Sequence, residues 1–353
     1  MALPEPRADL GLREGYHSPQ AEVAIRLNTN ESPLPPPAAW IAALHDELAT
    51  VAWNRYPDRQ VTELRAALAD LHGVRPDQVF CANGSNEVLQ CLCLAYGGQG
   101  RSVAVFEPTY ALHSHIAHLT GTAVAEGQRR PDFSLDLDVV RDVMEAERPA
   151  ITFLCSPNNP TGLAEDPSTV RAVLGAAPGL VVVDEAYGQF ADWSALGLVD
   201  DGVPLVVTRT FSKTWSMAAA RLGYLVGPAP VVAVLERVVL PYHLDALKQA
   251  AGLLALRFVG EMEDRIGLIV RERQRLLAAL ARLPVTAWPS QANFILFRPE
   301  KRKGAEVWQG LLDRSVLVRD TSTWPRLANC LRVTVGTPEE NDAFLSALAE
   351  VLA

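Results

Sequence analysis

The chain has 353 residues, of which 49% are hydrophobic and 21% are charged, a composition typical of globular proteins. Its formal net charge of −9 argues against nucleic acid as a main partner, because binding a phosphate backbone requires a basic face. No apolar run is long enough for a membrane span, so we expect no membrane partner, and the length favours two domains.

The five cysteines all lie inside apolar stretches of the sequence. Two of them, Cys91 and Cys93, are two residues apart on a predicted helix, where they do not face each other. Buried free thiols are therefore favoured over a disulfide or a metal site. We expect a cytoplasmic protein without a metal centre.

The N-terminal residues are polar, with proline and glycine, and we place an arm at residues 1–35. The proline-rich run 33–37 could be a polyproline ligand, but a rigid lead-in to a helix over residues 38–49 is favoured. Apolar residues at helical spacing predict a second helix from Val61 to Leu71, which stops at Gly73.

Short apolar strands then alternate with helices. The expected strands are 79–82, 102–106, a strand around Val124, 150–154, 180–183, 205–208 and 222–226. Strands that are apolar on both faces belong to a sheet that helices cover on both sides. We therefore expect a large domain over residues 36–240, built on a mostly parallel sheet.

The C-terminal part repeats this alternation on a smaller scale. Residues 231–283 are mostly helical, and strands at 292–297, 316–319 and 331–335 alternate with helices at 305–312 and 338–352. This pattern predicts a smaller α/β domain over residues 241–353, so the fold class is α/β with two unequal domains.

Functional side chains gather after the predicted strands of the large domain. The turn at Gly84, Tyr110, Asn158, Asp184 and Lys213 each follow a strand end. Because ligands of parallel α/β sheets bind beyond the carboxyl ends of the strands, these five positions should converge on one site. The Gly84 turn also opens a helix, whose free N–H groups favour an anion.

Lys213 is the candidate for covalent chemistry. Of the four lysines it alone follows a strand-like run, and Ser212 and Thr214 flank it with hydroxyl groups. A lysine held away from solvent near other cations loses its proton more easily, which an imine-forming amine requires. A surface lysine is the usual interpretation of a Ser-Lys pair, and the accompanying motifs argue against it here.

The motifs form an ordered set that extends over nearly the whole chain, from about Tyr16 onward. They are RLNTNESP, NRYPD, ANGSNE, SPNNPTG, VVDEAYGQF, TRTFSK and LRVTVGTPEENDAF. In this order they resemble the fold-type I aminotransferases, which depend on pyridoxal 5′-phosphate, and within that fold the histidinol-phosphate aminotransferases. The resemblance implies that L-histidinol phosphate and 2-oxoglutarate give imidazole-acetol phosphate and L-glutamate, a step of histidine biosynthesis.

The resemblance also implies roles at the cofactor ring. Lys213 would hold the cofactor covalently and later act as the base that moves the α-proton of the substrate. Asp184 would keep the pyridine nitrogen protonated, which makes the ring an electron sink. Asn158 and Tyr187 would hydrogen-bond the ring oxygen, and Tyr110 would stack on the ring face.

The cofactor phosphate would bind at the Gly84 turn. Its donors would be Ser85, Asn86, Thr210, Ser212 and Arg221. By resemblance, Tyr56 of the Arg-Tyr-Pro turn reaches the phosphate of a neighbouring subunit, which implies a homodimer with shared active sites.

Arg332 lies within an apolar strand, and because a buried unpaired arginine is costly it should face an anion. By resemblance, that anion is the carboxylate of glutamate in one half-reaction and the substrate phosphate in the other. Arg319 and Tyr16 match positions that the family uses for this phosphate, and Asn30 matches a residue that lines the same pocket. His243 could meet an imidazole, but a structural histidine is favoured.

Departures from the family's pattern leave the substrate open. Ser32 stands where the family often has Asn, and Ala219-Ala220 precedes Arg221 where Gly is usual. The close alternative is an aromatic amino acid aminotransferase, and a phosphothreonine decarboxylase of similar fold is a second. A regulator would need a basic DNA-binding domain ahead of the enzyme domain, for which we expect no room in the polar N-terminal stretch.

Overall fold

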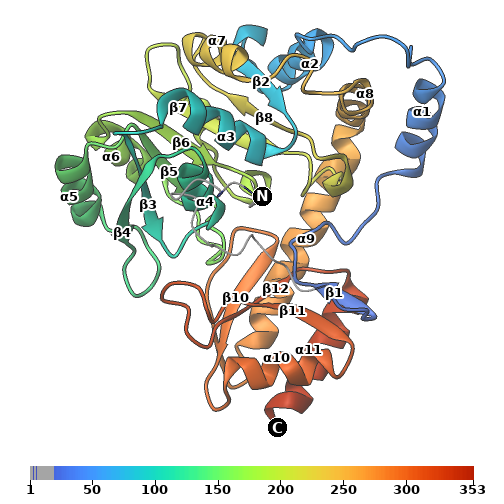
Figure 1. Ribbon diagram of the computed structural model, residues 1–353. Coiled ribbons are helices and arrows are strands. Elements are labelled where there is room, and N and C mark those ends of the chain that lie inside the picture. Colours follow the sequence, from blue (N-terminus) through green and yellow to red (C-terminus); the bar gives the residue numbers. More distant parts are fainter. Residues whose placement is uncertain (1–2, 4, 6–19) are drawn as a thin grey trace.

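The computed structural model describes residues 3, 5 and 20–353. These residues form two β-sheets with helices packed around them, and the long helix α9 (Val259–Leu280) runs between the two bodies (Figure 1). Within the described part of the chain, no helix has both the length and the apolar character that crossing a bilayer requires.

The larger sheet has seven strands in the order β2-β8-β7-β6-β5-β3-β4. All of them run parallel except β8, which is antiparallel to both of its neighbours. Their bounds are β2 Val79–Ala82, β3 Ser102–Glu107, β4 Ala123–Gln128, β5 Ile151–Cys155, β6 Leu180–Asp184, β7 Leu205–Thr210 and β8 Gly223–Val226. The mostly parallel sheet predicted from the apolar strands is confirmed.

Helices cover both faces of this sheet because alternate strand residues are apolar on each face. Val103 and Val105 pack toward one side, and Ala104 between them packs toward the other. The first side carries α3 (Ser85–Tyr96), α4 (Leu112–Leu119) and α7 (Ala229–Val238). The second carries α5 (Leu137–Glu147), α6 (Pro167–Ala176), α1 (Ala38–Leu48), α2 (Thr62–His72) and α8 (Ala246–Ala255).

Local sequence signals explain several helix boundaries. Helix α2 ends at Gly73, whose φ of 64° is the left-handed conformation that glycine adopts without strain. Asp166 accepts hydrogen bonds from two backbone N–H groups at the start of α6, and Thr337 forms a capping box with Glu340 at the start of α11 (Pro338–Leu352). Short 3-10 turns connect the longer elements: Pro76–Gln78, Gly188–Phe190, Ala195–Leu198, Ala218–Ala220 and Leu256–Phe258.

The smaller sheet has five strands in the order β1-β11-β12-β10-β9. Their bounds are β1 Ile25–Leu27, β9 Val285–Ala287, β10 Phe294–Pro299, β11 Val316–Asp320 and β12 Leu331–Thr334. Helices α9, α10 (Gly304–Leu312) and α11 pack on it around a separate apolar core (Figure 1). Strand β1 comes from the N-terminal segment and pairs in parallel with β11. The division into residues 1–35, 36–240 and 241–353 stays a prediction.

Candidate active site

A cavity of about 270 Å³ opens where the parallel strands of the larger sheet end. Three parts of the chain line it: the loop after β1, the strand ends of the larger sheet, and β12 of the smaller sheet. The predicted site residues among its lining are Asn30, Ser85, Asn86, Tyr110, Asp184, Tyr187, Thr210, Ser212, Lys213, Arg221 and Arg332. Five other predicted residues, Gly84, Asn158, Arg319, Tyr56 and Tyr16, are considered separately below.

One end of the cavity is suited to an anion. Gly84 precedes the first turn of α3 with φ at 81°, and a Cβ placed there would lie 2.8 Å from Arg221 Nη2. Arg221 Nη1 donates to Ser212 Oγ at 3.1 Å, and Thr210 Oγ1 donates to the same oxygen at 3.0 Å. Free N–H groups at a helix start, two hydroxyls and a guanidinium together provide the donors that a phosphate accepts.

Lys213 lines this cavity and contributes its amine to it. Its Nζ donates to the carbonyl oxygen of Thr29 at 3.2 Å. Burial, together with the positive charges of Arg332 and Arg221, lowers the pKa of Lys213 to about 8, although the negative charge of Glu31 opposes this shift. The amine is therefore available in its neutral, nucleophilic form closer to neutral pH than an ordinary lysine.

Asp184 ends strand β6 with only 1% of its surface exposed. Its Oδ2 lies 3.1 Å from His113 Nε2, and its Oδ1 accepts a hydrogen bond from Thr208 Oγ1 at 3.1 Å. The His113 ring is itself buried and stacks on Phe153 at 4.6 Å. Sequence reasoning missed His113. Helix α4 begins at Leu112, just after Tyr110, and the His113 ring meets the Tyr110 ring edge to face at 5.4 Å.

Tyr187 is held by the loop that follows β1. Asn30 donates from Nδ2 to the Tyr187 hydroxyl at 3.0 Å, and Thr334 of β12 donates to Asn30 Oδ1 at 3.2 Å. Asn293 Nδ2 donates to the Asn30 carbonyl at 3.1 Å. The hydroxyl of Tyr187, which follows β6 of the larger sheet, is thus held by residues of the smaller sheet and of the segments next to its strands.

Arg273 of α9 makes two hydrogen bonds to residues that lie near Tyr187 and Asn293 in the chain. Its Nη1 donates to the carbonyl of Phe190, three residues after Tyr187, at 3.2 Å, and to that of Ala292, next to Asn293, at 3.0 Å. The long helix is therefore tied both to the segment that carries Tyr187 and to the segment that carries Asn293.

Asn158 does not line the cavity, whereas its neighbour Asn159 does. The Asn158 amide is fully buried: Nδ2 donates to Pro108 O and Thr161 Oγ1 at 2.9 Å, and Oδ1 accepts from Thr109 Oγ1 at 2.8 Å. These bonds join the loops after β3 and β5. Asn159 accepts a hydrogen bond from Arg332 Nη1 instead. An Asn-Asn pair contains no signal that favours the second residue, since only the backbone path decides which one faces inward.

The two predicted substrate arginines occupy facing positions on β11 and β12. Arg319 and Arg332 are direct partners in the antiparallel register. Arg332 is buried, lines the cavity, and donates from Nη2 to the carbonyl of Asn28 at 3.0 Å. Arg319 is also buried but does not line the cavity.

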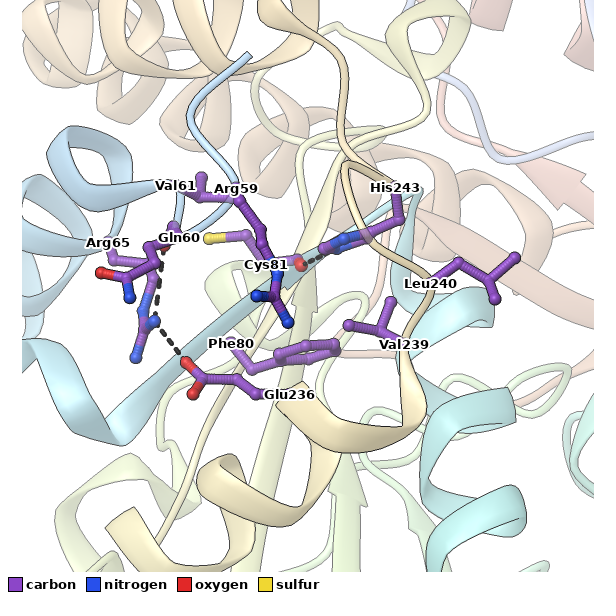
Figure 2. Close-up of a pocket in the computed structure, with 10 residues that line it drawn as sticks. All are labelled: Arg59, Gln60, Val61, Arg65, Phe80, Cys81, Glu236, Val239, Leu240 and His243. Carbon is purple, nitrogen blue, oxygen red and sulfur yellow. Dashed lines mark hydrogen bonds and ion pairs between the residues drawn. The ribbon is translucent and has the colours of Figure 1, made fainter. Parts of the chain in front are cut away.

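Tyr56 and His243 lie away from the 270 Å³ cavity of their own chain. Tyr56 is 80% exposed and stacks on Tyr242 at 4.5 Å, and Tyr16 lies outside the described residues. His243 borders a second cavity of about 130 Å³, shown in Figure 2, where its Nε2 lies 2.9 Å from the carbonyl oxygen of Cys81. Its ring also stacks on Phe80 at 5.9 Å, the environment of a structural histidine.

Residues 22–348 match the family described as aminotransferase class I and II. This chain belongs to that family. Aminotransferases of the family depend on pyridoxal 5′-phosphate, as the sequence motifs predicted.

Among curated class I and II aminotransferases, a histidinol-phosphate aminotransferase of Frankia casuarinae is 45% identical over 352 residues, covering 96% of this chain and 87% of the relative. One from Corynebacterium glutamicum is 41% identical, covering 98% and 97%. The fold matches the crystal structure of histidinol-phosphate aminotransferase from Sinorhizobium meliloti in complex with pyridoxal 5′-phosphate. That comparison has a TM-score of 0.85 and 23% identity, and it covers 94% of this chain and 91% of the other.

The residues of the cavity fit the family's cofactor. A phosphate needs the donors that gather around Gly84 and Arg221, and the missing Cβ of Gly84 leaves the space beside the guanidinium open. A pyridine ring that must stay protonated needs a buried carboxylate, which Asp184 provides. An aldehyde carbon needs an amine that can be neutral, which Lys213 provides.

Proposed function

We propose that this chain transfers the amino group of L-histidinol phosphate to 2-oxoglutarate, giving imidazole-acetol phosphate and L-glutamate. The observation that carries the proposal is one cavity that combines Lys213 with two arginines, Arg221 near the larger sheet and Arg332 on the smaller one. Such a cavity can accept two anions, one from the cofactor and one from the substrate. The names of the curated relatives, at 41–45% identity over nearly the whole chain, support the choice of substrate.

Bound pyridoxal phosphate supplies a protonated ring that withdraws electrons and so acidifies the C–H bond next to the substrate nitrogen. We propose that Asp184, positioned by His113 and Thr208, keeps the proton on the pyridine nitrogen. Ser85, Ser212 and Arg221 bind the cofactor phosphate. Asn159, in place of Asn158, and Tyr187 face the ring oxygen, and Tyr110 covers the ring.

Lys213 is the base in this proposal. Its Nζ removes the α-proton of the substrate, which requires an amine that is neutral when it accepts the proton. Burial and the neighbouring arginines lower the pKa of Lys213 and so favour that neutral form. Arg332 binds the carboxylate of glutamate or the phosphate of histidinol phosphate, and Arg319 behind it adds a second positive charge toward the phosphate.

We further propose a cytoplasmic homodimer with shared active sites. Several large apolar side chains of the described residues are exposed, and among them Trp53, Tyr56, Leu240 and Tyr242 could be covered by a second copy. By family resemblance Tyr56 reaches the phosphate bound to the neighbouring subunit. Five buried free thiols support a reducing compartment.

A half-reaction screen tests the proposed substrate. Holoenzyme is mixed with L-histidinol phosphate, L-phenylalanine or O-phospho-L-threonine, and the change in cofactor absorbance is followed without a 2-oxo acid. We expect the fastest conversion with histidinol phosphate and return of the original spectrum only after 2-oxoglutarate is added. A faster conversion with phenylalanine would favour the aromatic aminotransferase, and release of carbon dioxide from phosphothreonine would favour the decarboxylase.

A further inference from the structure

Trp324 lies in the loop that joins β11 to β12, residues 321–330, and its indole faces both buried arginines. The Arg319 guanidinium carbon is 5.4 Å from the centre of the ring system, and that of Arg332 is 5.9 Å from it. These are distances at which an aromatic face attracts a cation, and tryptophan is the strongest of the aromatic side chains in this respect.

The need for such a contact follows from the register of the two strands. Arg319 and Arg332 stand directly opposite each other, so their like charges lie on the same face of the sheet, an arrangement that destabilises a sheet. Both side chains are also buried, which weakens screening by water. An electron-rich ring that contacts both guanidinium groups offsets part of this repulsion and limits the directions that the two side chains can take.

The loop itself is fixed at both ends. Thr321 donates from Oγ1 to the carbonyl of Cys330 at 2.8 Å, and the backbone N–H of Trp324 donates to the carbonyl of Thr321 at 3.0 Å. Leu327 is fully buried in an apolar cluster with Phe133, which comes from the segment before α5. The indole is thus held by packing that includes the body of the larger sheet.

The larger sheet contributes a second contact to this loop. Arg326 donates to the carbonyl of Arg129, which follows directly on β4. Trp324 therefore contacts the arginine pair of the smaller sheet from a loop that is anchored on segments next to the larger sheet.

We propose that Trp324 is a positioning residue that determines specificity for phosphorylated substrates, because it holds Arg319 and Arg332 together in the orientation that a dianion requires. This inference rests on the proposed function. A phosphate dianion bound at Arg332 is also attracted by the positive charge of Arg319 behind it, whereas a carboxylate needs only Arg332. Loss of the indole should therefore affect phosphate more than carboxylate recognition.

Two substitutions of Trp324 distinguish the effect of its aromatic face from the effect of its volume. Trp324→Leu keeps apolar packing but removes the aromatic face, and Trp324→Phe keeps a weaker aromatic face. Trp288→Leu is the matched control, since Trp288 belongs to the same apolar cluster but stacks over Arg298, which lies outside the cavity lining. Each holoenzyme is assayed in the glutamate half-reaction with inorganic phosphate as competitor, and in the histidinol phosphate half-reaction over a range of substrate concentrations.

For Trp324→Leu we expect phosphate to inhibit about tenfold more weakly and the half-saturating concentration of histidinol phosphate to rise about tenfold. The half-saturating concentration of glutamate and both maximal rates should change by no more than about twofold. Trp324→Phe should restore most of the loss, and Trp288→Leu should show none. Equal losses for glutamate and phosphate, or equal effects of the two leucine variants, would overturn the inference.

The two proposals fail in different ways. If the unsubstituted enzyme does not convert histidinol phosphate, the proposed substrate is wrong, but the phosphate competition against glutamate still reports on Trp324. If phosphate does not compete with glutamate in the unsubstituted enzyme, the arginine pair does not bind phosphate, and the role assigned to Trp324 is refuted.

Discussion

Lys213 combines burial with the charge of two arginines, and its protonation should therefore govern how it captures the cofactor. With its pKa lowered to about 8, the neutral fraction rises with pH below 8 and levels off above it. The rate of covalent attachment of pyridoxal phosphate to the cofactor-free protein should increase by about tenfold per pH unit well below 8 and reach a plateau above it.

Arg332→Met provides the control for this pH dependence. Arg332 is the strongest of the charges that lower the pKa of Lys213, so its removal should raise that pKa and move the midpoint of the rate profile to higher pH. Stopped-flow absorbance over a pH series measures both profiles. An unchanged midpoint would show that the charge of Arg332 does not contribute to the lowered pKa.

The neighbours Asn158 and Asn159 offer a second test at the scale of the residue. Asn158→Ala leaves buried partners without their hydrogen bonds and should lower the free energy of unfolding by about 1–3 kcal/mol for each unsatisfied group. Asn159→Ala should leave stability nearly unchanged but lower kcat/KM, because it removes a contact of Arg332 inside the cavity. Denaturant unfolding and steady-state kinetics on both variants separate the two effects, and the opposite pattern would return the cofactor role to Asn158.

These neighbours also show what sequence patterns can and cannot locate. Motif order identified the loop after β5, because polar residues that follow a buried strand lie at the edge of the sheet where ligands bind. It did not choose between adjacent asparagines, since side-chain direction in a loop depends on each backbone dihedral. His113 and Asn293 were missed for a related reason: a lone polar residue within a helix or a loop carries no periodic signal.

At the scale of elements, the start of α3 depends on the glycine before it. A Cβ on Gly84 would lie only 2.8 Å from Arg221 Nη2 and would therefore displace the guanidinium. The positive φ of Gly84 would also strain any other residue at this position. Gly84→Ala should weaken cofactor binding by about tenfold or more, the scale for losing one charge-assisted hydrogen bond. Titration of the cofactor-free protein with pyridoxal phosphate measures this change.

Gly73→Ala is the matched control, because Gly73 also has a positive φ but a Cβ added there would meet no heavy atom within 4 Å. It should lower the free energy of unfolding by about 1–2 kcal/mol and leave cofactor affinity unchanged. Equal losses of affinity in the two variants would mean that strain in the backbone, and not the position of Arg221, limits cofactor binding.

The elements themselves were predicted best where they are long or fully apolar. Strands such as Leu180–Asp184 and helices such as Pro338–Leu352 carry enough residues for their periodicity to show. The strands Ile25–Leu27 and Val285–Ala287 have three residues each, too few for an alternation, and they form only because a longer strand lies beside them. Pairing of this kind depends on distant parts of the chain.

For the whole molecule, the dimer with shared sites that we propose makes a prediction about mixed subunits. Lys213→Ala and Tyr56→Phe should each reduce activity severely, because each removes one component of the site. When the two variants are unfolded, mixed and refolded, part of the activity should return, since a hybrid dimer has both defects in one site and none in the other. A mixture no more active than its components, or full activity of a monomer at low concentration, would contradict shared sites.

The two arginines that we propose bind the anions of cofactor and substrate belong to different sheets, Arg221 beside the larger one and Arg332 within the smaller one. The distance between these arginines, and with it the length of the molecule that fits between them, therefore depends on how far apart the two sheets are held. Arg273 on α9 ties the segment after β6 to the segment before β10, one from each sheet. Selection for longer or shorter amine phosphates should accordingly find productive substitutions along α9, remote from every reacting atom.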